Sequence, residues 1–335
     1  MLRSAVVLLS SVWVWGCASG GPHSRLATHS SESGPLDVPL GLDAFASVPE
    51  DNPITAAKAD LGRRIFTDPI LSRDRSRSCA SCHRPESAFA DSARVSAGVA
   101  GPRSTRNAPT LLNRAYGKSF FWDGRAASLE EAVLLPIEDP NELALPLSAL
   151  LDRLRADARY RAHFRRAFPN EEIGRTTLSR ALATYVGTLR TGATPVDRYV
   201  AGDSTALGPA ARRGRAIFLG KGGCADCHSG PTFSDERFHN TGVAVGTNDR
   251  GRYAISGDSA DRRRFKTPTL RQIARTAPYM HDGSLPTLER VVDFYDGGGR
   301  PNPELDPEIR PLHLTTTEKA DLLAFLRALG GSTTK

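Results

Sequence analysis

The sequence contains no apolar run of the roughly 20 residues that a membrane-spanning helix needs. An apolar stretch at Ala5–Trp15, which follows Arg3, is too short for that role and is typical of a secretory signal peptide. Hydrophobic residues make up 39% of the chain, which is enough for globular cores and too few for a protein with several membrane spans. Residues 1–17 are therefore expected to act as an export signal, and the mature chain is expected in the periplasm.

Basic residues do not form a run that alternates with aromatic residues, although the formal net charge is +7. The arginines are scattered along the chain, which favours a solvated surface over a nucleic-acid site. We therefore predict no nucleic-acid partner. Alternating strand patterns are also scarce, so the fold is expected to be mostly α-helical.

The chain has no cysteine left over for a structural disulfide. Four of its five cysteines form two Cys-x-x-Cys pairs, and the fifth is Cys17. Small residues flank Cys17, which resembles a lipoprotein cleavage box, although Trp15 fits that box poorly. A lipid anchor at Cys17, ordinary cleavage nearby and an uncleaved anchor all remain open, and each of them places the mature chain outside the cytoplasm.

A repeated unit organises the rest of the chain. The segment Leu61–Phe66 precedes a Cys-x-x-Cys-His motif at Cys79–His83, and the similar segment Arg213–Phe218 precedes a second such motif at Cys224–His228. Two copies of one unit predict two similar domains. Residues 18–45 are rich in Ser, Gly and Pro and are expected to form a tether. The N-terminal domain is expected at 46–205 and the C-terminal domain at 206–330.

Helical spacing of apolar residues recurs in both predicted domains. It is found at Leu147, Leu150, Leu151 and Leu154, at Leu178, Ala181, Leu182 and Tyr185, at Leu288, Val291, Val292 and Tyr295, and at Leu322, Phe325, Leu326 and Leu329. Capping boxes are predicted at Thr315 with Glu318 and at Ser128 with Glu131.

Cys-x-x-Cys-His is the attachment signature of c-type haem. The two thiols add to the vinyl groups of the porphyrin, and the adjacent histidine ligates the iron. A zinc site built from all four thiolates gives the two histidines no role. A thioredoxin-like redox pair needs a βαβ context that the sequence lacks. The predicted haem-binding residues are Cys79, Cys82, His83, Cys224, Cys227 and His228.

From about residue 49 to residue 330 the chain resembles the bacterial dihaem cytochrome c peroxidase/MauG family. The matching segments, in chain order, are LGRRIFTDPILS (61–72), CASCH (79–83), RNAPTLLN (106–113), FWDGRAASLEEA (121–132), CADCH (224–228), FKTPTLR (265–271) and TAPYMHDGS (276–284). The resemblance implies two cytochrome c-like helical domains, each with one covalently bound haem. The first haem would bind peroxide, and the second would transfer electrons.

The resemblance also implies roles for single residues. Trp122 matches a tryptophan that relays electrons between the haems. Glu142 matches a distal glutamate that moves protons between the two oxygen atoms of peroxide. Tyr295 matches the sixth ligand of the second haem iron, with Met280 and His281 as rival ligands in the preceding loop.

The same resemblance implies a calcium ion between the domains. Asn107 would offer a side-chain oxygen, and Thr276 and Pro278 would offer backbone carbonyls. Hard oxygen ligands of this kind suit calcium.

Three positions depart from the family pattern. The stretch Val95–Gly101 has no histidine where members that need reductive activation carry a distal one. The first haem is therefore expected to be five-coordinate or water-bound. Ala132 replaces a distal glutamine, which removes one hydrogen-bond donor, and Gly222 stands where MauG has a tryptophan.

The sequence thus predicts a peroxidase that reduces hydrogen peroxide with electrons from a small cytochrome or copper protein. One alternative is a MauG-like oxidant that uses peroxide to oxidise a partner protein. The other is a dihaem electron carrier without enzymatic activity, which would need six ligands on both irons.

Overall fold

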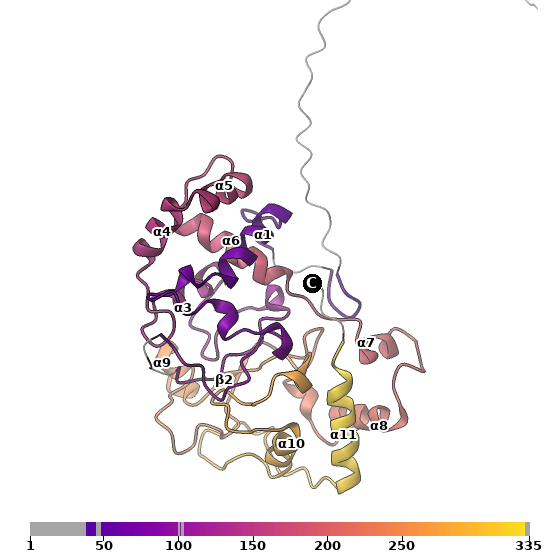
Figure 1. The fold of residues 1–335 in the computed structure, drawn as a ribbon. Coiled ribbons are helices and arrows are strands. Elements are labelled where there is room, and N and C mark those ends of the chain that lie inside the picture. The colour runs from indigo at the N-terminus through magenta and orange to yellow at the C-terminus, as the bar shows by residue number, and fades with distance from the viewer. Residues whose placement is uncertain (1–37, 45–47, 100, 102–103, 332–335) are drawn as a thin grey trace, which may run out of the picture. The chain divides into compact units, whose positions relative to one another are not determined.

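The structure is a computed structural model that describes residues 38–44, 48–99, 101 and 104–331. The predicted signal peptide, Cys17 and most of the predicted tether lie outside these residues. The prediction of a mostly helical fold is confirmed (Figure 1). The α-helices are α1 (Ala56–Thr67), α2 (Leu129–Ala132), α3 (Leu135–Glu138), α4 (Leu147–Ala156), α5 (Ala158–Ala167), α6 (Arg175–Thr188), α7 (Pro195–Val200), α8 (Pro209–Leu219), α9 (Tyr253–Ser256), α10 (Leu288–Asp296) and α11 (Thr316–Ala328).

Short 3-10 helices and one small sheet complete the secondary structure of the described residues. The 3-10 helices are η1 (Pro69–Leu71), η2 (Cys79–Ser81), η3 (Pro85–Ser87), η4 (Arg114–Tyr116), η5 (Cys224–Asp226), η6 (Ser259–Asp261) and η7 (Ile273–Arg275). The strands β1 (Phe238–His239) and β2 (Phe265–Lys266) pair antiparallel, with Phe238 opposite Lys266.

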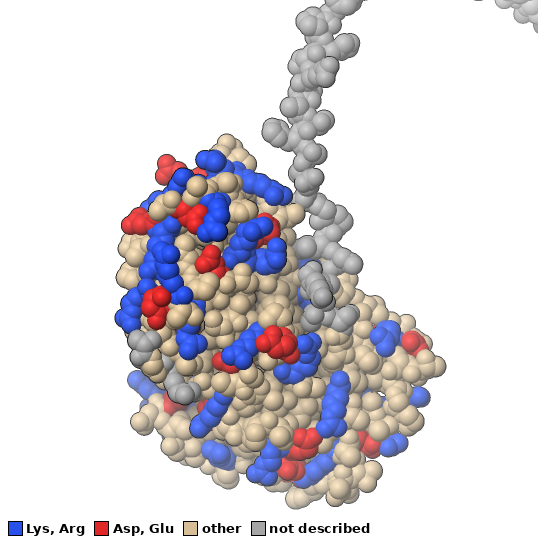
Figure 2. All heavy atoms as spheres, in the orientation of Figure 1, with Lys and Arg blue, Asp and Glu red and all other residues tan. Residues whose placement is uncertain are grey.

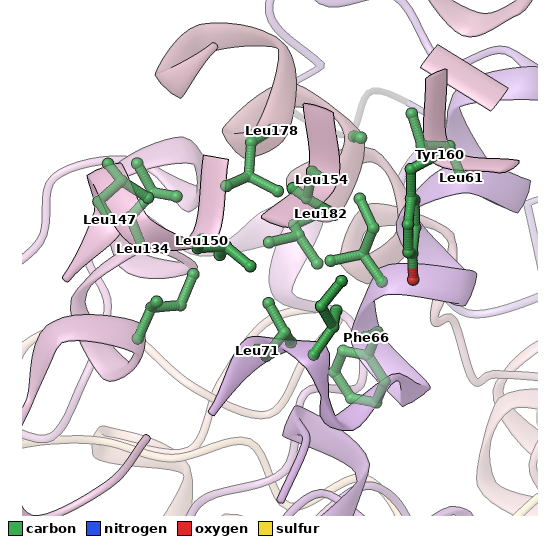
Figure 3. Close-up of a cluster of buried hydrophobic side chains, with 14 of the residues drawn as sticks. Leu61, Phe66, Leu71, Leu134, Leu147, Leu150, Leu154, Tyr160, Leu178 and Leu182 are labelled. Carbon is green, nitrogen blue, oxygen red and sulfur yellow. The ribbon is translucent and has the colours of Figure 1, made fainter. Parts of the chain in front are cut away.

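The first hydrophobic core lies among α1, α4, α5 and α6. Its side chains include Leu61, Leu150, Leu154 and Leu178, none of which has any exposed surface (Figure 3). Helix α1 crosses α6 closely at Gly62, where a Cβ atom would overlap the backbone carbonyl of Ala181. The absence of a side chain at this glycine therefore lets the two helices approach each other.

The second core repeats this arrangement with α8, α10 and α11. Helix α8 crosses α11 at Gly214, where a Cβ atom would overlap the carbonyl of Asp321. Phe218 and Phe325 pack beside the crossing, with ring centroids 5.0 Å apart. Gly62 and Gly214 occupy the same position in the two copies of the repeated sequence, so one sequence feature fixes both helix crossings.

The predicted helical patterns fall within α4, α6, α10 and α11, except that Leu329 caps the C-terminus of α11. Thr315 and Glu318 form the predicted capping box at the start of α11. Ser128 accepts a hydrogen bond from the Glu131 N–H, but the Glu131 carboxylate accepts from Ala127 instead of Ser128. The second predicted box is therefore only half formed, and the α2 helix that follows it is a single turn.

Both cores belong to one compact unit. Val196 of α7 packs in the second core, although α7 precedes the predicted domain boundary at residue 205. The described end of the predicted tether also contacts the body, because the carbonyl of Gly41 accepts a hydrogen bond from Arg271 at 2.8 Å. Within the described residues, no helix has the length and apolar character that crossing a bilayer requires.

The two halves of the molecule meet through a pair of similar hairpin loops. One loop is closed by a bridge between Phe120 and Ala126, and the other by a bridge between Tyr279 and Leu285. Gly124 in the first loop packs against Phe238 of the second half, where a Cβ atom would overlap the ring. Gly283 in the second loop packs against Arg94 of the first half, where a Cβ atom would overlap the backbone carbonyl. Each loop thus contacts the opposite half of the molecule.

Candidate active site

The first Cys-x-x-Cys-His motif folds as the 3-10 turn η2 and its next two residues. Cys79 packs against the first core. The imidazole Nδ1 of His83 lies 3.0 Å from the backbone carbonyl of Phe89. A hydrogen bond from Nδ1–H to this carbonyl leaves Nε2 unprotonated and able to ligate a metal.

The second motif has the same geometry in η5. Cys224 packs against the second core, and Nδ1 of His228 lies 3.0 Å from the carbonyl of Phe233. Both acceptor carbonyls belong to residues with positive φ, which is 58° at Phe89 and 53° at Phe233. This tight backbone turn is held in each half by a threonine hydroxyl. Thr110 donates to the carbonyl of Ala88 at 2.6 Å, and Thr269 donates to the carbonyl of Thr232 at 2.5 Å.

Burial disfavours the charged forms of the Cys79, Cys82 and Cys224 thiols and of both motif imidazoles. Burial, and then the neighbouring charges of Cys82 and Glu142, raise the pKa of Cys79 to about 12. Burial also raises the pKa of Cys224 to about 12 and lowers the pKa values of His83 and His228. Neutral thiols and a neutral imidazole in an apolar setting fit the attachment and axial ligation of a haem.

The two thiol pairs do not come together in one place. Across the described ranges, no three His, Cys, Asp or Glu side chains are grouped as a metal centre would require. A single zinc site made from both pairs is therefore incompatible with the fold. Each pair instead has its own core, its own histidine and its own carbonyl partner.

Glu142 lies beside the first motif. Burial and the nearby Asp139 carboxylate raise the pKa of Glu142 to about 7, and its charge in turn acts on both Cys79 and Cys82. The Val99 N–H donates to the backbone carbonyl of Glu142 at 2.8 Å. The Val95–Gly101 loop, which has no histidine, is thus hydrogen-bonded through Val99 to the segment that contains Glu142.

Ala132, where the family carries a glutamine, ends helix α2. Its side chain is 9% exposed and packs with Phe120 and Ala126 in a small cluster of its own. The methyl group offers no hydrogen bond, so Ala132 cannot supply the donor that a glutamine would.

The second motif opens onto a large apolar cavity. Its walls include Phe218 of α8, Leu288 and Val292 of α10, and Leu322 and Leu326 of α11. The thiols of Cys224 and Cys227 and the ring of His228 also line it. Apolar walls with a thiol pair and one imidazole on the same cavity are what a covalently attached porphyrin requires.

Tyr295, Met280 and His281 all line this cavity. Tyr295 projects from α10, whose N-terminus is capped by Thr287 and whose C-terminus is capped by Gly297. Burial raises the pKa of Tyr295, and the Cys227 side chain acts in the same direction. The tyrosine hydroxyl therefore lies in the cavity close to the thiol pair.

His281 is held at the boundary between the two halves. Its ring stacks on Phe265 with a centroid distance of 3.6 Å and an angle of 12°. Its Nε2 lies 3.9 Å from the Asp249 carboxylate. These contacts fix the imidazole in the boundary, which leaves Tyr295 and Met280 as the stronger candidates for an iron ligand.

Trp122 faces His281 across the boundary, with ring centroids 6.4 Å apart at an angle of 70°. The two residues occupy equivalent positions in the two hairpin loops. The indole N–H of Trp122 donates to the carbonyl of Asn107 at 2.8 Å, and the Asn107 N–H donates to the carbonyl of His281 at 2.7 Å. Asn107 thus connects both loops.

The three residues predicted to bind calcium come from both halves and line the same cavity: Asn107, Thr276 and Pro278. The Asn107 amide group donates to the carbonyl of Ala93 at 3.1 Å, so its nitrogen is engaged and its oxygen is the atom available to a cation.

Sequence reasoning missed the charged residues that join the two halves. Arg106 binds both carboxylate oxygens of Asp249 at 2.8 Å and also contacts Asp123 at 2.6 Å. Arg114 binds Glu236, and Lys266 binds the same glutamate. The only available signal was that Arg106 and Lys266 lie inside segments that were already recognised as motifs.

His239 is a further residue without a prediction. Its two ring nitrogens lie 2.6 Å from the carboxylate of Asp306 and 2.9 Å from that of Asp235. The Asp306 carboxylate, and then the Cys227 side chain, raise the pKa of His239 to about 11. The imidazole therefore stays charged beside the second motif.

Charged side chains are interspersed on the surface. On the face shown in Figure 2, Lys and Arg lie among Asp and Glu, with tan regions between them.

Comparison with known proteins gives a consistent result. A family model described as di-haem cytochrome c peroxidase matches residues 56–205. The methylamine utilization protein MauG of Methylorubrum extorquens is 43% identical, over 84% of this chain and 80% of the relative. The cytochrome c551 peroxidase of Nitrosomonas europaea is 34% identical, over 83% of this chain and 81% of the relative.

Solved structures agree with the sequence relatives. The crystal structure of a MauG-like protein associated with microbial copper homeostasis matches with a TM-score of 0.81 at 35% identity, and covers 88% of this chain and 95% of that protein. The diheme peroxidase BthA from Burkholderia thailandensis matches with a TM-score of 0.74 at 26% identity, over 82% of this chain and 86% of that protein.

Proposed function

Because the chain belongs to the di-haem cytochrome c peroxidase family, which includes MauG, we propose that it binds two covalent c-type haems and reduces hydrogen peroxide at the first. The thioether bonds would form at Cys79 with Cys82 and at Cys224 with Cys227. His83 and His228 would ligate the irons. The observation that carries this proposal is the repeated hydrogen bond from each imidazole Nδ1 to a backbone carbonyl, which leaves Nε2 free to ligate an iron in both halves.

A haem held by Cys79, Cys82 and His83 would supply peroxide binding and redox chemistry at the first site. The protein contributes proton transfer at the first site through the Glu142 carboxylate. With a pKa of about 7, this group accepts a proton from one peroxide oxygen and donates it to the departing one at neutral pH. The Val95–Gly101 loop has no histidine that could serve as a second axial ligand at the first site.

Electron supply would use the second site and the boundary between the halves. Trp122 lies in that boundary, and its indole N–H is bound to the Asn107 carbonyl. Electrons from a small cytochrome or copper protein would enter at the second haem and pass through Trp122. An Asn107, Thr276 and Pro278 calcium site would stiffen this boundary, since it takes ligands from both halves.

Export to the periplasm fits this chemistry, because c-type haem is attached there to apoproteins with Cys-x-x-Cys-His motifs. Residues 1–17 would direct export, and Cys17 is the candidate for a lipid anchor. Both features lie outside the described residues.

Turnover tests the peroxidase proposal. Purified protein with both haems is mixed with a reduced small cytochrome c and hydrogen peroxide, and oxidation of the cytochrome is followed by its absorbance. We expect oxidation of two cytochrome molecules per peroxide consumed. A protein that binds peroxide but oxidises neither a small cytochrome nor a copper protein would contradict the proposal.

A MauG-like role is the second candidate, and Tyr295 favours it. An anionic oxygen ligand lowers the reduction potential of a haem, whereas methionine raises it. The 43% identity to MauG points the same way. In that case oxidising equivalents would pass to a side chain of a partner protein. Stable spectral changes at both haems after peroxide, without any external reductant, would favour this role over cytochrome oxidation.

Replacing Tyr295 by Phe tests the ligand itself. We expect the spectrum of the second haem to change, because the oxygen ligand is lost. Met280→Leu serves as the matched variant from the preceding loop, since Met280 lines the same cavity. A change in Met280→Leu with none in Tyr295→Phe would transfer the ligand role to methionine.

A further inference from the structure

A buried ionic cluster connects the two halves beside the second site. Arg114 belongs to the first half, and its two terminal nitrogens donate to the Glu236 carboxylate at 2.9 and 3.0 Å. Lys266 of β2 contacts the same carboxylate, with Nζ 3.2 Å from Oε2. The exposed fractions are 9% for Arg114, 8% for Glu236 and 7% for Lys266, so all three groups are withdrawn from water.

The charges of this cluster do not balance. Two cations share one carboxylate, which leaves a net charge of +1 in a buried place. The nearby Asp235 also acts on Lys266, but this carboxylate is already bound to the charged His239 at 2.9 Å. Burial of an uncompensated charge is costly, so a further anion is expected within reach.

Lys266 is the member of the cluster that has donors left for such an anion. Its ammonium group has three N–H donors, and among the described residues one of them is used, for Glu236. Lys266 also lines the apolar cavity that holds Cys224, His228 and Tyr295, whereas Arg114 and Glu236 are not part of that lining. The unbalanced charge is therefore presented to the second haem site.

We propose that Lys266 binds a propionate carboxylate of the second haem and so balances the Arg114–Glu236–Lys266 cluster. The inference rests on the proposed attachment of haem at Cys224 and Cys227. A haem brings carboxylates into a cavity whose other walls are largely apolar, and one carboxylate brings the buried charge to zero.

The contact also links the haem to Trp122. The backbone N–H of Lys266 donates to the carbonyl of Trp122 at 2.8 Å. A propionate bound to the Lys266 ammonium would therefore contact a residue that is itself hydrogen-bonded to Trp122, the proposed electron relay. Burial and the Arg114 guanidinium lower the pKa of Lys266 to about 8, and a bound carboxylate opposes that shift and keeps the ammonium charged. Lys266 acts as a positioning residue for the cofactor.

The test measures the reduction potential of each haem as charges in the cluster are changed. Lys266→Met leaves the propionate uncompensated, which stabilises the ferric state, so the second haem should shift to a lower potential. Glu236→Gln adds net positive charge and should shift it to a higher potential. In the double variant, Arg114 alone balances the propionate, and the potential should return close to that of the wild type.

Lys221→Met is the matched control, because it removes an exposed lysine of the same half that pairs with Glu318 on the surface. It should leave both potentials unchanged. The reduction potentials are measured only on protein whose intact mass shows two haems. Wild-type protein without haem at the second motif would refute the proposed function.

The propionate contact can fail while the proposed function holds. Single variants that retain both haems and have the wild-type potential at the second haem would overturn it. A shift confined to the first haem would also overturn it, since the carboxylate would then belong to the other cofactor. Opposite shifts in Lys266→Met and Glu236→Gln, cancelled in the double variant, are the expected result.

Discussion

The Glu142 carboxylate controls the proton chemistry expected at the first site. Its pKa is raised from 4.5 to about 7 by burial and by Asp139, so it is protonated below neutral pH and ionised above it. Only the ionised form accepts a proton from peroxide. The rate of reaction with peroxide should therefore rise with pH through about 7 and level off above it, as stopped-flow absorbance would record.

Replacing Glu142 by Gln should remove this pH dependence and slow the reaction roughly 10²–10⁴-fold, because the amide neither accepts nor returns the proton. Glu172→Gln is the control, since it removes an exposed carboxylate from the same half. If Glu142→Gln reacts with peroxide as fast as the wild type, the proton must move through another group.

The neighbouring carboxylate offers a finer test of the same residue. Asp139 raises the pKa of Glu142 through its negative charge, and its Oδ1 also accepts a hydrogen bond from the Asn141 N–H at 2.8 Å. Asp139→Asn removes the charge and retains an acceptor for that turn. The midpoint of the pH–rate profile should move to lower pH, and a midpoint that stays in place or rises would exclude Asp139 as its cause.

Sequence reasoning could select residues whose neighbours along the chain define their chemistry. The two Cys-x-x-Cys-His motifs are local patterns of this kind, and each packs against a hydrophobic core. Tyr295 was selected through the family resemblance, and it lines the cavity of the second motif. The two carboxylates bound to His239 and the ionic cluster at Lys266 could not be predicted from local sequence patterns. Their partners, Asp306 and Arg114, are 67 and more than a hundred residues away, at distances along the chain that no local pattern reports.

At the level of elements, two helix crossings fix the position of each motif. Gly62→Ala should force α1 away from α6, and Gly214→Ala should force α8 away from α11, because a Cβ atom at either position overlaps a backbone carbonyl. Overpacking of this kind costs about 1–3 kcal/mol. The midpoint of urea unfolding, followed by helical circular dichroism, should fall for each variant.

Gly174→Ala is the matched control for both helix variants. Gly174 precedes α6 with φ near −150°, and the nearest atom to a Cβ there is 3.9 Å away, so an alanine fits without displacing anything. Its unfolding midpoint should stay close to that of the wild type. If the Gly62→Ala and Gly214→Ala variants are as stable as this control, close approach of the two helices at these glycines is not needed for stability.

The long helices were predictable because their apolar spacing extends over several turns. The shorter elements were not, since β1 and β2 have two residues each and are defined by pairing between distant segments. The hairpin loops around Trp122 and His281 depend on left-handed backbone at Phe121, with φ of 66°, and at Met280, with φ of 74°. Phenylalanine and methionine give no sequence signal for that conformation.

For the whole molecule, the contact between the two halves depends on buried and half-buried ion pairs. Arg106 joins Asp123 of its own half to Asp249 of the other, with side-chain exposures of 14%, 7% and 21%. Arg106→Met leaves Asp249 without its guanidinium. Breaking a pair of this kind by removing one partner costs roughly 3 kcal/mol when it is well buried.

A double-mutant cycle isolates that contribution. Asp249→Asn removes the carboxylate that Arg106→Met leaves behind, so the double variant should be less destabilised than the sum of the two single changes. Urea unfolding of the four proteins gives the coupling free energy. Strict additivity would mean that the ion pair does not hold the two halves together.

The sequence repeat predicted two similar units, and two cores built on equivalent helix crossings are what the fold contains. It did not predict how the units meet. That arrangement depends on reciprocal contacts, such as Gly124 against Phe238 and the Lys266 N–H on the Trp122 carbonyl, which exist only once both units have folded.

The most direct test of the central claim joins intact mass with the spectrum of the oxidised, exported protein. We predict a chain that carries two covalently added haems and has a high-spin component that reacts at once with peroxide in the absence of any reductant. A chain without the added mass, or one whose two haems are wholly low-spin and inert to peroxide, would contradict the account.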